Sequence, residues 1–125
     1  MRILGVGVDV VEIERVQRLL RERPSFRERV FTLDERRYCD GKAAGSAGCY
    51  AARWAAREAA RKALGGVRGL RWHDISVERA RSGAPALALG GPARARADHV
   101  GVTKVLVSFS HERSIATAFC VAVGP

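Results

Sequence analysis

The sequence predicts an α+β fold in which an antiparallel sheet carries helices packed on one side, arranged as two strand–helix–strand halves. Three observations predict it: an alternating run at residues 3–10, a long helical segment at residues 49–64, and two later pairs of alternating runs joined by turns. The resulting order of strand, helices, hairpin, helix and hairpin is typical of α+β proteins. We expect residues 1–125 to form one domain, because domains usually hold about 100–150 residues.

The first strand is expected to have one bare face. Three valines alternate along residues 3–10 and share one face, whereas Gly5, Gly7 and Asp9 share the other. Because glycines leave no side chains beside it, the Asp9 carboxylate is open to a ligand or to another backbone. The alternative is that Asp9 only caps the helix that follows.

Short helices are expected between this strand and residue 40. An apolar stripe predicts a helix over residues 13–22, and Pro24 ends it. Residues 26–31 hold core anchors in a second short helix. Thr32 and Glu35 have the spacing of a capping box, which predicts the start of a third helix.

Residues 40–48 and 49–64 contrast sharply in composition. The former are small, polar and rich in glycine, which predicts a mobile loop or hinge. The latter are rich in alanine and free of glycine and proline, and Gly65 follows where a left-handed C-cap is expected. Residues 49–64 are therefore the strongest helix prediction in the chain.

The second half is expected to contain two hairpins with a helix between them. Pro92 stands at the first position of that helix, where a missing N–H costs nothing. The expected elements are a strand at 75–79, a turn at 81–85, a strand at 86–89, a helix at 92–100, a strand at 104–110, a turn at 111–114 and a strand at 115–123.

Composition excludes several classes of protein. No apolar run reaches the roughly 18 residues that span a bilayer, and the acidic Asp9 and Glu12 near the start argue against a signal peptide. Three widely spaced cysteines without a CxxC pair do not suggest a disulfide framework or a zinc knuckle, so they are interpreted as small buried or incidental side chains. We expect a cytoplasmic protein that does not associate with membranes.

A strong positive charge predicts an anionic ligand or partner. The chain carries 22 lysines and arginines against 13 aspartates and glutamates, a net charge of +9, and residues 53–81 hold eight bases against three acids. Such a charge also suits a nucleic-acid-binding module without catalysis, which is the alternative function. Only eight aromatic residues and no recognition-helix motif are present, so we expect no nucleic-acid partner.

The helix at residues 49–64 displays a row of functional groups. Trp54, Glu58 and Lys62 recur four residues apart and share one stripe. The adjacent stripe holds Arg53, Arg57 and Arg61. An anionic ligand lying across this face would meet guanidinium groups, an ammonium and an indole.

One carboxylate among so many bases suggests a metal ligand. Asp9 and Glu58, if brought together, would suit Mg²⁺, which prefers one or two protein carboxylates plus phosphate oxygens of a substrate. The alternative is that Glu58 only pairs with Lys62 on a solvated helix. His111 is expected to open the final turn at a sheet end, either as a ligand-binding group or as exposed polar surface.

Four motifs, in this order and spacing, resemble the holo-acyl-carrier-protein synthase family, the small 4′-phosphopantetheinyl transferases. They are Gly5-Val-Gly-Val-Asp9, Arg53-Trp-Ala-Ala-Arg-Glu58-Ala-Ala-Arg-Lys62-Ala-Leu-Gly65, Gly83-Ala-Pro85 and Val107-Ser-Phe-Ser-His111. The helical motif is the specific one, and the resemblance covers nearly the whole chain.

The resemblance implies transfer of phosphopantetheine from coenzyme A to a serine of an apo acyl carrier protein, with release of adenosine 3′,5′-bisphosphate. It also implies Mg²⁺ as cofactor and a homotrimer with active sites between subunits. Asp9 and Glu58 match the family's metal-binding carboxylates. The implied catalytic residues are Glu58, Lys62 and His111, and the implied coenzyme A contacts are Arg53, Trp54, Lys62, Gly65, Gly83, Pro85 and His111.

Catalysis in this reading rests on positioning and charge neutralisation. Lys62 would stabilise the leaving phosphate, while either a metal-oriented water or a carboxylate such as Glu58 takes the serine proton. Arg57 and Glu112 depart from the family pattern, the former standing where lysine is usual. Carrier proteins of this kind are acidic, so we expect docking on the basic residues of the first helix, which are Arg15, Arg18 and Arg21.

Overall fold

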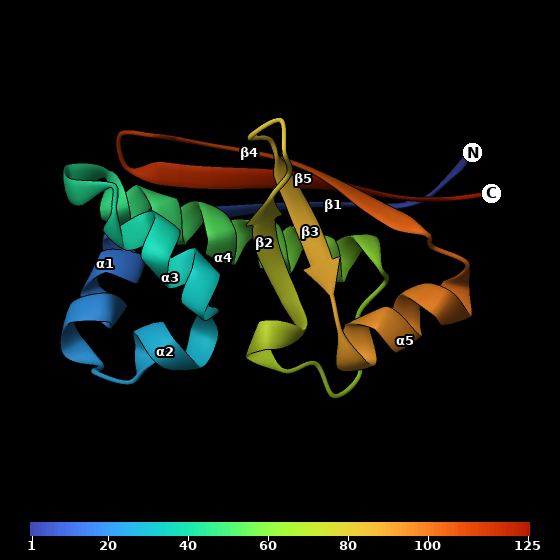
Figure 1. Cartoon of the computed structure of the whole chain (residues 1–125), viewed down its shortest axis with the longest axis horizontal. Coiled ribbons are helices and arrows are strands. Elements are labelled where there is room, and N and C mark those ends of the chain that lie inside the picture. The colour runs from blue at the N-terminus through green and yellow to red at the C-terminus, as the bar shows by residue number, and fades with distance from the viewer.

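A three-stranded sheet, a long helix packed along it and an outer layer of short helices and a hairpin build the fold (Figure 1). The structure is a computed structural model and describes residues 1–125. The α+β class predicted from the sequence is confirmed. None of the helices combines the length and the apolar character that crossing a membrane requires. The elements are β1 (Arg2–Glu12), α1 (Ile13–Glu22), α2 (Phe26–Val30), α3 (Leu33–Asp40), a 3₁₀ turn (Ala43–Gly45), α4 (Ser46–Ala63), a second 3₁₀ turn (Trp72–Asp74), β2 (Ile75–Arg79), β3 (Pro85–Leu89), α5 (Gly91–Val100), β4 (Lys104–Glu112) and β5 (Ile115–Gly124).

All strand pairs are antiparallel, and the five strands divide between two sheets. β1, β5 and β4 lie side by side in that order, whereas β2 pairs only with β3. The two halves of the chain are therefore unequal, because the first contributes only β1 to the larger sheet. β1 and β5 run antiparallel, so the two ends of the chain lie together, and the Arg2 side chain donates a hydrogen bond to the Pro125 carbonyl (Figure 1).

The glycine face of β1 lies directly against α4. A Cβ atom at Gly7 would stand 1.9 Å from the Ala59 carbonyl oxygen, and one at Gly5 would stand 2.0 Å from the Ala63 oxygen. Only a hydrogen atom fits in place of a side chain at these two positions. On the helix side, the residues of α4 that pack in this contact are buried alanines. This close approach carries Asp9, two residues after Gly7, to the surface of α4.

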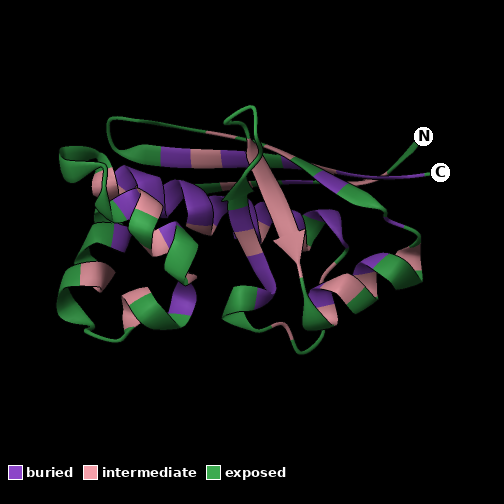
Figure 2. Ribbon diagram, in the orientation of Figure 1, coloured by how far each residue is buried: buried purple, intermediate pink, exposed green.

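The valine face of β1 has no cover within the chain. Val6, Val8 and Val10 are 56%, 52% and 61% exposed, and Leu106 and Phe119 are also exposed on the large sheet. The buried residues concentrate instead along α4 (Figure 2). The sheet therefore has helices on one face, as predicted, and an apolar, solvent-exposed opposite face.

The loop predicted at residues 40–48 is shorter than expected. α4 begins at Ser46, so the prediction was wrong for residues 46–48. The His111 ring packs so closely against this part of α4 that a Cβ atom at position 48 would lie 2.7 Å from His111 Nδ1. Glycine is therefore required at position 48 even though the residue lies inside a helix. Composition alone suggested a loop, whereas packing against β4 requires a glycine in the first turns of α4.

The last hairpin is longer than predicted. β4 continues through His111 and Glu112, which pair with Ala116 and Ile115, so the expected four-residue turn was wrong. The connection consists of two residues, and Arg113 adopts the left-handed conformation with φ of 54°. His111 therefore stands on a strand, which holds its imidazole against α4.

The predicted start of α3 is confirmed and also joins two layers. Thr32 Oγ1 accepts a hydrogen bond from the Glu35 backbone N–H, and Glu35 Oε1 accepts one from the Thr32 N–H, completing a capping box. Glu35 Oε2 also accepts from the Val77 N–H at 2.9 Å. The buried Glu35 carboxylate thus caps the start of α3 and also holds β2 beside this helix.

Candidate active site

Asp9, Glu58 and Lys62 meet where β1 crosses α4, and we call them the carboxylate–lysine cluster. Lys62 Nζ donates a 2.9 Å hydrogen bond to the Val8 carbonyl and lies 3.4 Å from Asp9 Oδ1. Burial raises the pKa of the Asp9 carboxyl above its ordinary value, the Lys62 ammonium opposes this, and the charge of Glu58 adds to the rise. The structure therefore brings together three residues that sequence analysis expected to bind the metal or to act in catalysis.

Glu58 is held by two arginines of its own helix. Arg57 Nη1 lies 2.6 Å from Glu58 Oε2, and Arg61 Nη2 lies 3.3 Å from Glu58 Oε1. Lys62 reaches across to Asp9 instead, so the simple Glu58–Lys62 pair that was the alternative reading is not formed. The two ion pairs therefore orient the Glu58 carboxylate, whose charge acts on Asp9.

Arg57 is a buried support and does not belong to an exposed row of guanidinium groups. Its guanidinium stacks 4.4 Å from the centre of the Trp72 ring, and its Nε donates to the Trp72 carbonyl. Burial lowers the pKa of Arg57, although the neighbouring Glu58 charge counteracts this. The predicted stripe of Arg53, Arg57 and Arg61 is thus divided: the first two are buried, and only Arg61 is partly exposed.

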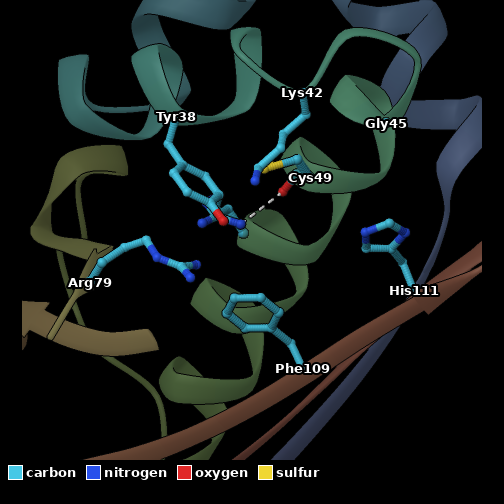
Figure 3. A pocket seen from close by; sticks show the side chains of 8 residues that line it. Tyr38, Lys42, Gly45, Cys49, Arg79, Phe109 and His111 are labelled. Atoms are coloured by element: carbon cyan, nitrogen blue, oxygen red, sulfur yellow. Dashed lines mark hydrogen bonds between the residues drawn. The ribbon is translucent and has the colours of Figure 1, made fainter. Parts of the chain in front are cut away.

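A second site on α4 is a cavity of about 310 Å³ that we call the basic pocket (Figure 3). Its lining residues are Tyr38, Lys42, Gly45, Cys49, Arg53, Arg79, Phe109 and His111. Four of these carry basic side chains and none is acidic, so the pocket suits an anion.

Arg53 forms the floor of the basic pocket and has spare hydrogen-bonding capacity. It is only 4% exposed and lies between the Tyr38 and Phe109 rings, at 4.6 and 5.3 Å from their centres. Nη1 donates to the Cys49 carbonyl, whereas the buried Nε has no partner. An unpartnered buried donor among other cations indicates a site built for an anionic group.

Sequence analysis found Arg53 and His111 but missed Lys42 and Arg79. Lys42 lies in the glycine-rich connection before α4, and Arg79 ends β2, so neither belongs to a recognisable local motif. Pro85 pairs with Arg79 across the hairpin and therefore adjoins the basic pocket. Gly83, with φ of 86°, forms the tip of the same hairpin.

Trp54 does not line the basic pocket. Its ring stacks between Phe26 and Trp72, with ring centres 5.9 and 5.3 Å away. These rings line a cavity of about 450 Å³ between α1, α2 and α4, which we call the aromatic groove, together with Arg23 and Arg29. The structure thus separates Trp54 from Arg53 and His111, with which the family resemblance had grouped it.

The remaining predicted residues lie at the two ends of the site. Gly65, in the left-handed conformation with φ of 76°, borders a small depression beside Lys62. The three arginines of α1 are exposed, and none forms an ion pair within the chain; they are Arg15, Arg18 and Arg21. Within one copy of the chain, the predicted residues are therefore distributed over the carboxylate–lysine cluster, the basic pocket, the aromatic groove and the exposed face of α1.

Comparison with known proteins gives these residues a context. A family model for the 4′-phosphopantetheinyl transferase superfamily matches residues 5–120. A holo-[acyl-carrier-protein] synthase of Anaeromyxobacter sp. (strain K) is 48% identical over 126 residues, covering 98% of this chain and 97% of that protein. The enzyme of the same name from Beutenbergia cavernae is 45% identical over 120 residues, covering 96% and 97%.

Solved structures agree with the fold. The holo-ACP-synthase of Plasmodium yoelii has a TM-score of 0.85 at 28% identity, covering 99% of this chain and 97% of that one. An ACPS–CoA complex from Chronobacterium ammoniagenes has a TM-score of 0.81 at 30% identity, covering 97% of each chain. The resemblance carried by the four sequence motifs is thereby confirmed, and the chain belongs to the 4′-phosphopantetheinyl transferase superfamily.

Proposed function

We propose that this chain is a holo-[acyl-carrier-protein] synthase, which moves the 4′-phosphopantetheine group of coenzyme A onto a serine of an apo acyl carrier protein. The observation that carries the proposal is the meeting of Asp9, Glu58 and Lys62 where β1 crosses α4. The relatives that share nearly half of its residues carry this enzyme name. Residues 1–125 would act as one transferase domain, since the family match spans most of them.

The donor set of the carboxylate–lysine cluster fits Mg²⁺. Asp9 is a partly buried carboxylate whose charge is opposed by burial and by the nearby charge of Glu58, so a divalent cation would relieve both penalties. Two carboxylates are also what Mg²⁺ takes from a protein when substrate phosphates and water supply its other ligands. Asp9 and Glu58 would hold the ion, which when bound neutralises the charge on the pyrophosphate of coenzyme A.

The side chains of the cluster divide the remaining work. The serine oxygen forms a bond to the phosphorus that carries the pantetheine arm, and the bond from that phosphorus to the bridging oxygen breaks. The Lys62 ammonium lies beside Asp9 and can stabilise the negative charge that collects on the departing adenosine 3′,5′-bisphosphate. The serine proton passes to Glu58 or to a water beside it.

The basic pocket would bind a phosphate of the donor. Arg53 offers its unpartnered Nε, and Lys42, Arg79 and His111 supply further positive or hydrogen-bonding groups. Several cations around one cavity neutralise a phosphate dianion better than any one of them. Two of the eight bases in the basic mid-chain segment, Arg53 and Arg79, would thus serve in binding the donor.

The direct test is a transfer assay. The protein is mixed with coenzyme A, MgCl₂ and an apo acyl carrier protein, and the carrier is weighed by mass spectrometry. We expect the carrier to gain the mass of one phosphopantetheine group, and a carrier with its acceptor serine replaced by alanine to gain nothing. Absence of any gain with fatty-acid, polyketide and peptide carriers alike would contradict the proposal.

We also propose that the chain works as a homotrimer through the exposed face of its large sheet. Val6, Val8 and Val10 form an apolar stripe with no cover in the chain, and burying such a stripe against other copies would favour assembly. In such a trimer, the carboxylate–lysine cluster of one subunit and the basic pocket of its neighbour would together form one active site.

Val8→Glu should therefore yield monomers with little transferase activity, because a charge in the middle of the stripe cannot be buried without cost. Leu33→Glu is the matched control: Leu33 is equally exposed, at 50%, but lies on α3, away from the sheet. Light scattering and activity at the same protein concentration provide the measurement. A fully active monomer would remove the shared site and leave the chemistry of the cluster standing.

Carrier docking on α1 gives a separate prediction. The exposed side chains of Arg15, Arg18 and Arg21 lie on the helix that borders the aromatic groove, so an acidic carrier would meet both charge and apolar surface there. Arg15→Glu or Arg18→Glu should raise the KM for the carrier several-fold and leave the KM for coenzyme A nearly unchanged. The wild-type KM for the carrier should also rise with salt, because exposed charges are screened.

The control for docking is Arg68→Glu, a charge reversal at an exposed arginine that follows α4 and makes no ion pair within the chain. It changes the net charge equally and should leave the KM for the carrier unaltered. Equal effects of all three reversals would mean that overall charge, rather than α1, attracts the carrier.

A further inference from the structure

Two of the three cysteines touch each other at the wall of the basic pocket. Cys39 on α3 and Cys49 on α4 are 0% and 5% exposed, and their sulfur atoms are 2.6 Å apart. Cys49 also lines the cavity, so a small solute in the pocket can reach its sulfur (Figure 3). The sequence suggested only incidental buried thiols, because nine residues separate the two cysteines along the chain.

The surroundings of Cys49 favour its thiolate, which is the nucleophilic form of cysteine. The hydrogen bond from the Cys39 thiol lowers the pKa of Cys49 below its ordinary value, and the positive charges of Arg53, Lys42 and Arg79 contribute, although burial opposes them. The same hydrogen bond, together with burial, raises the pKa of Cys39. The two thiols therefore differ in character: one is activated and the other is protonated beside it.

We propose that Cys39 and Cys49 form a redox-sensitive pair, in which a hydroperoxide entering the basic pocket oxidises Cys49 and Cys39 then closes a disulfide that joins α3 to α4. The geometry meets the requirements of such a site, namely an accessible sulfur among cations and a second sulfur already in contact with it. A disulfide needs the sulfur atoms at about 2.05 Å, and the two sulfur atoms are already neighbours in the reduced protein.

The chemistry balances with hydrogen peroxide as the oxidant. The Cys49 thiolate attacks one peroxide oxygen, the O–O bond breaks, and the hydroxide that leaves takes a proton to become water, so Cys49 becomes a sulfenic acid. Cys39 then loses its proton and attacks the Cys49 sulfur, the S–O bond breaks, and a second water leaves. In sum, two thiols are oxidised by two electrons and one peroxide is reduced to two waters.

Occupancy of the pocket should control this oxidation, a corollary that rests on the proposed function. An anion bound by Lys42, Arg53 and Arg79 covers the Cys49 sulfur and neutralises the charges that favour its thiolate. Bound nucleotide should therefore slow the loss of the Cys49 thiol several-fold. The probe is adenosine 3′,5′-bisphosphate, with adenosine as the uncharged control.

The experiment treats the chain of residues 1–125 with hydrogen peroxide, quenches with acid and maps the peptides by mass spectrometry. We expect a Cys39–Cys49 disulfide and a mass loss of two hydrogens. Cys120 is an internal control: it is fully buried away from the pocket, and burial raises its pKa to about 12. Its thiol should be lost at least about tenfold more slowly than that of Cys49.

The variant Cys39→Ser distinguishes the two roles. Without the second thiol, Cys49 should stop at the sulfenic acid, which dimedone traps as a stable adduct. A circular dichroism spectrum checks that the variant is folded, and the wild-type peptide map does not depend on any variant.

The proposal would be overturned if the folded wild-type protein formed no Cys39–Cys49 disulfide, or if Cys120 reacted as fast as Cys49. A disulfide that forms at the same rate with and without the nucleotide would uphold the redox pair and count against the pocket as the donor site. The two proposals therefore fail by different observations.

Discussion

Glu58→Gln and Asp9→Asn should each lower kcat by about 10²-fold or more while the fold survives. Both substitutions preserve side-chain size and remove one negative charge from the pair that would hold Mg²⁺. Because the lost interaction neutralises charge during the transfer, the effect should appear in kcat at saturating Mg²⁺ and coenzyme A. The measurement is the initial rate of carrier modification, with the melting temperature of each variant recorded alongside.

Stability separates a catalytic role for Asp9 from a structural one. The pKa of Asp9 is raised in the folded protein, so its charge is disfavoured there, and its contribution to stability falls as the pH rises through the ordinary and then the raised pKa. Asp9→Asn should consequently leave the melting temperature at pH 7 unchanged or higher, even though it loses the contact with Lys62.

Asp98→Asn is the matched control, since Asp98 is an exposed carboxylate on α5 that pairs only with Arg94. It should keep wild-type activity. Near-wild-type turnover of either Glu58→Gln or Asp9→Asn at saturating Mg²⁺ would remove that residue from the metal site, and a collapse in stability would show that its role is structural.

Gly7→Ala should destabilise the protein by about 3 kcal/mol or more, which approaches the total stability of a small domain. The added methyl group would lie 1.9 Å from the Ala59 carbonyl oxygen. The backbone fixes the position of the methyl carbon and the oxygen belongs to the backbone of α4, so a change of side-chain rotamer cannot relieve the clash. Relief requires β1 and α4 to separate, which also pulls Asp9 away from Lys62. The free energy of unfolding comes from urea titration followed by circular dichroism.

Gly41→Ala provides the comparison for Gly7→Ala. Gly41 has φ of −72°, and the nearest atoms to an added Cβ would lie 3.5 Å away, an ordinary contact. This variant should be as stable as the wild type or slightly more so, because alanine reduces the freedom of the unfolded chain. If Gly7→Ala were equally harmless, β1 and α4 could not be as close as the structure places them.

Sequence by itself determined most of the elements and singled out the residues that we propose for the central site. Pro24 ends α1, the Thr32–Glu35 box begins α3, and the alanine-rich run forms the central helix, because each of these signals acts within about one helical turn. Asp9, Glu58 and Lys62 were singled out because they stand in motifs whose residues and spacing resemble those of the family.

Tertiary structure alone decided how those side chains are paired. Spacing on the helix allowed Glu58 to pair with Lys62, yet Lys62 contacts Asp9 and Glu58 contacts Arg57, because the glycines of β1 let the strand approach α4 closely enough to compete. The basic pocket depends on the same kind of encounter, since Lys42, Arg79 and His111 come from separate segments. Local rules describe neighbours up to about four positions apart, whereas a pocket or a touching pair of thiols depends on which surfaces are buried against each other.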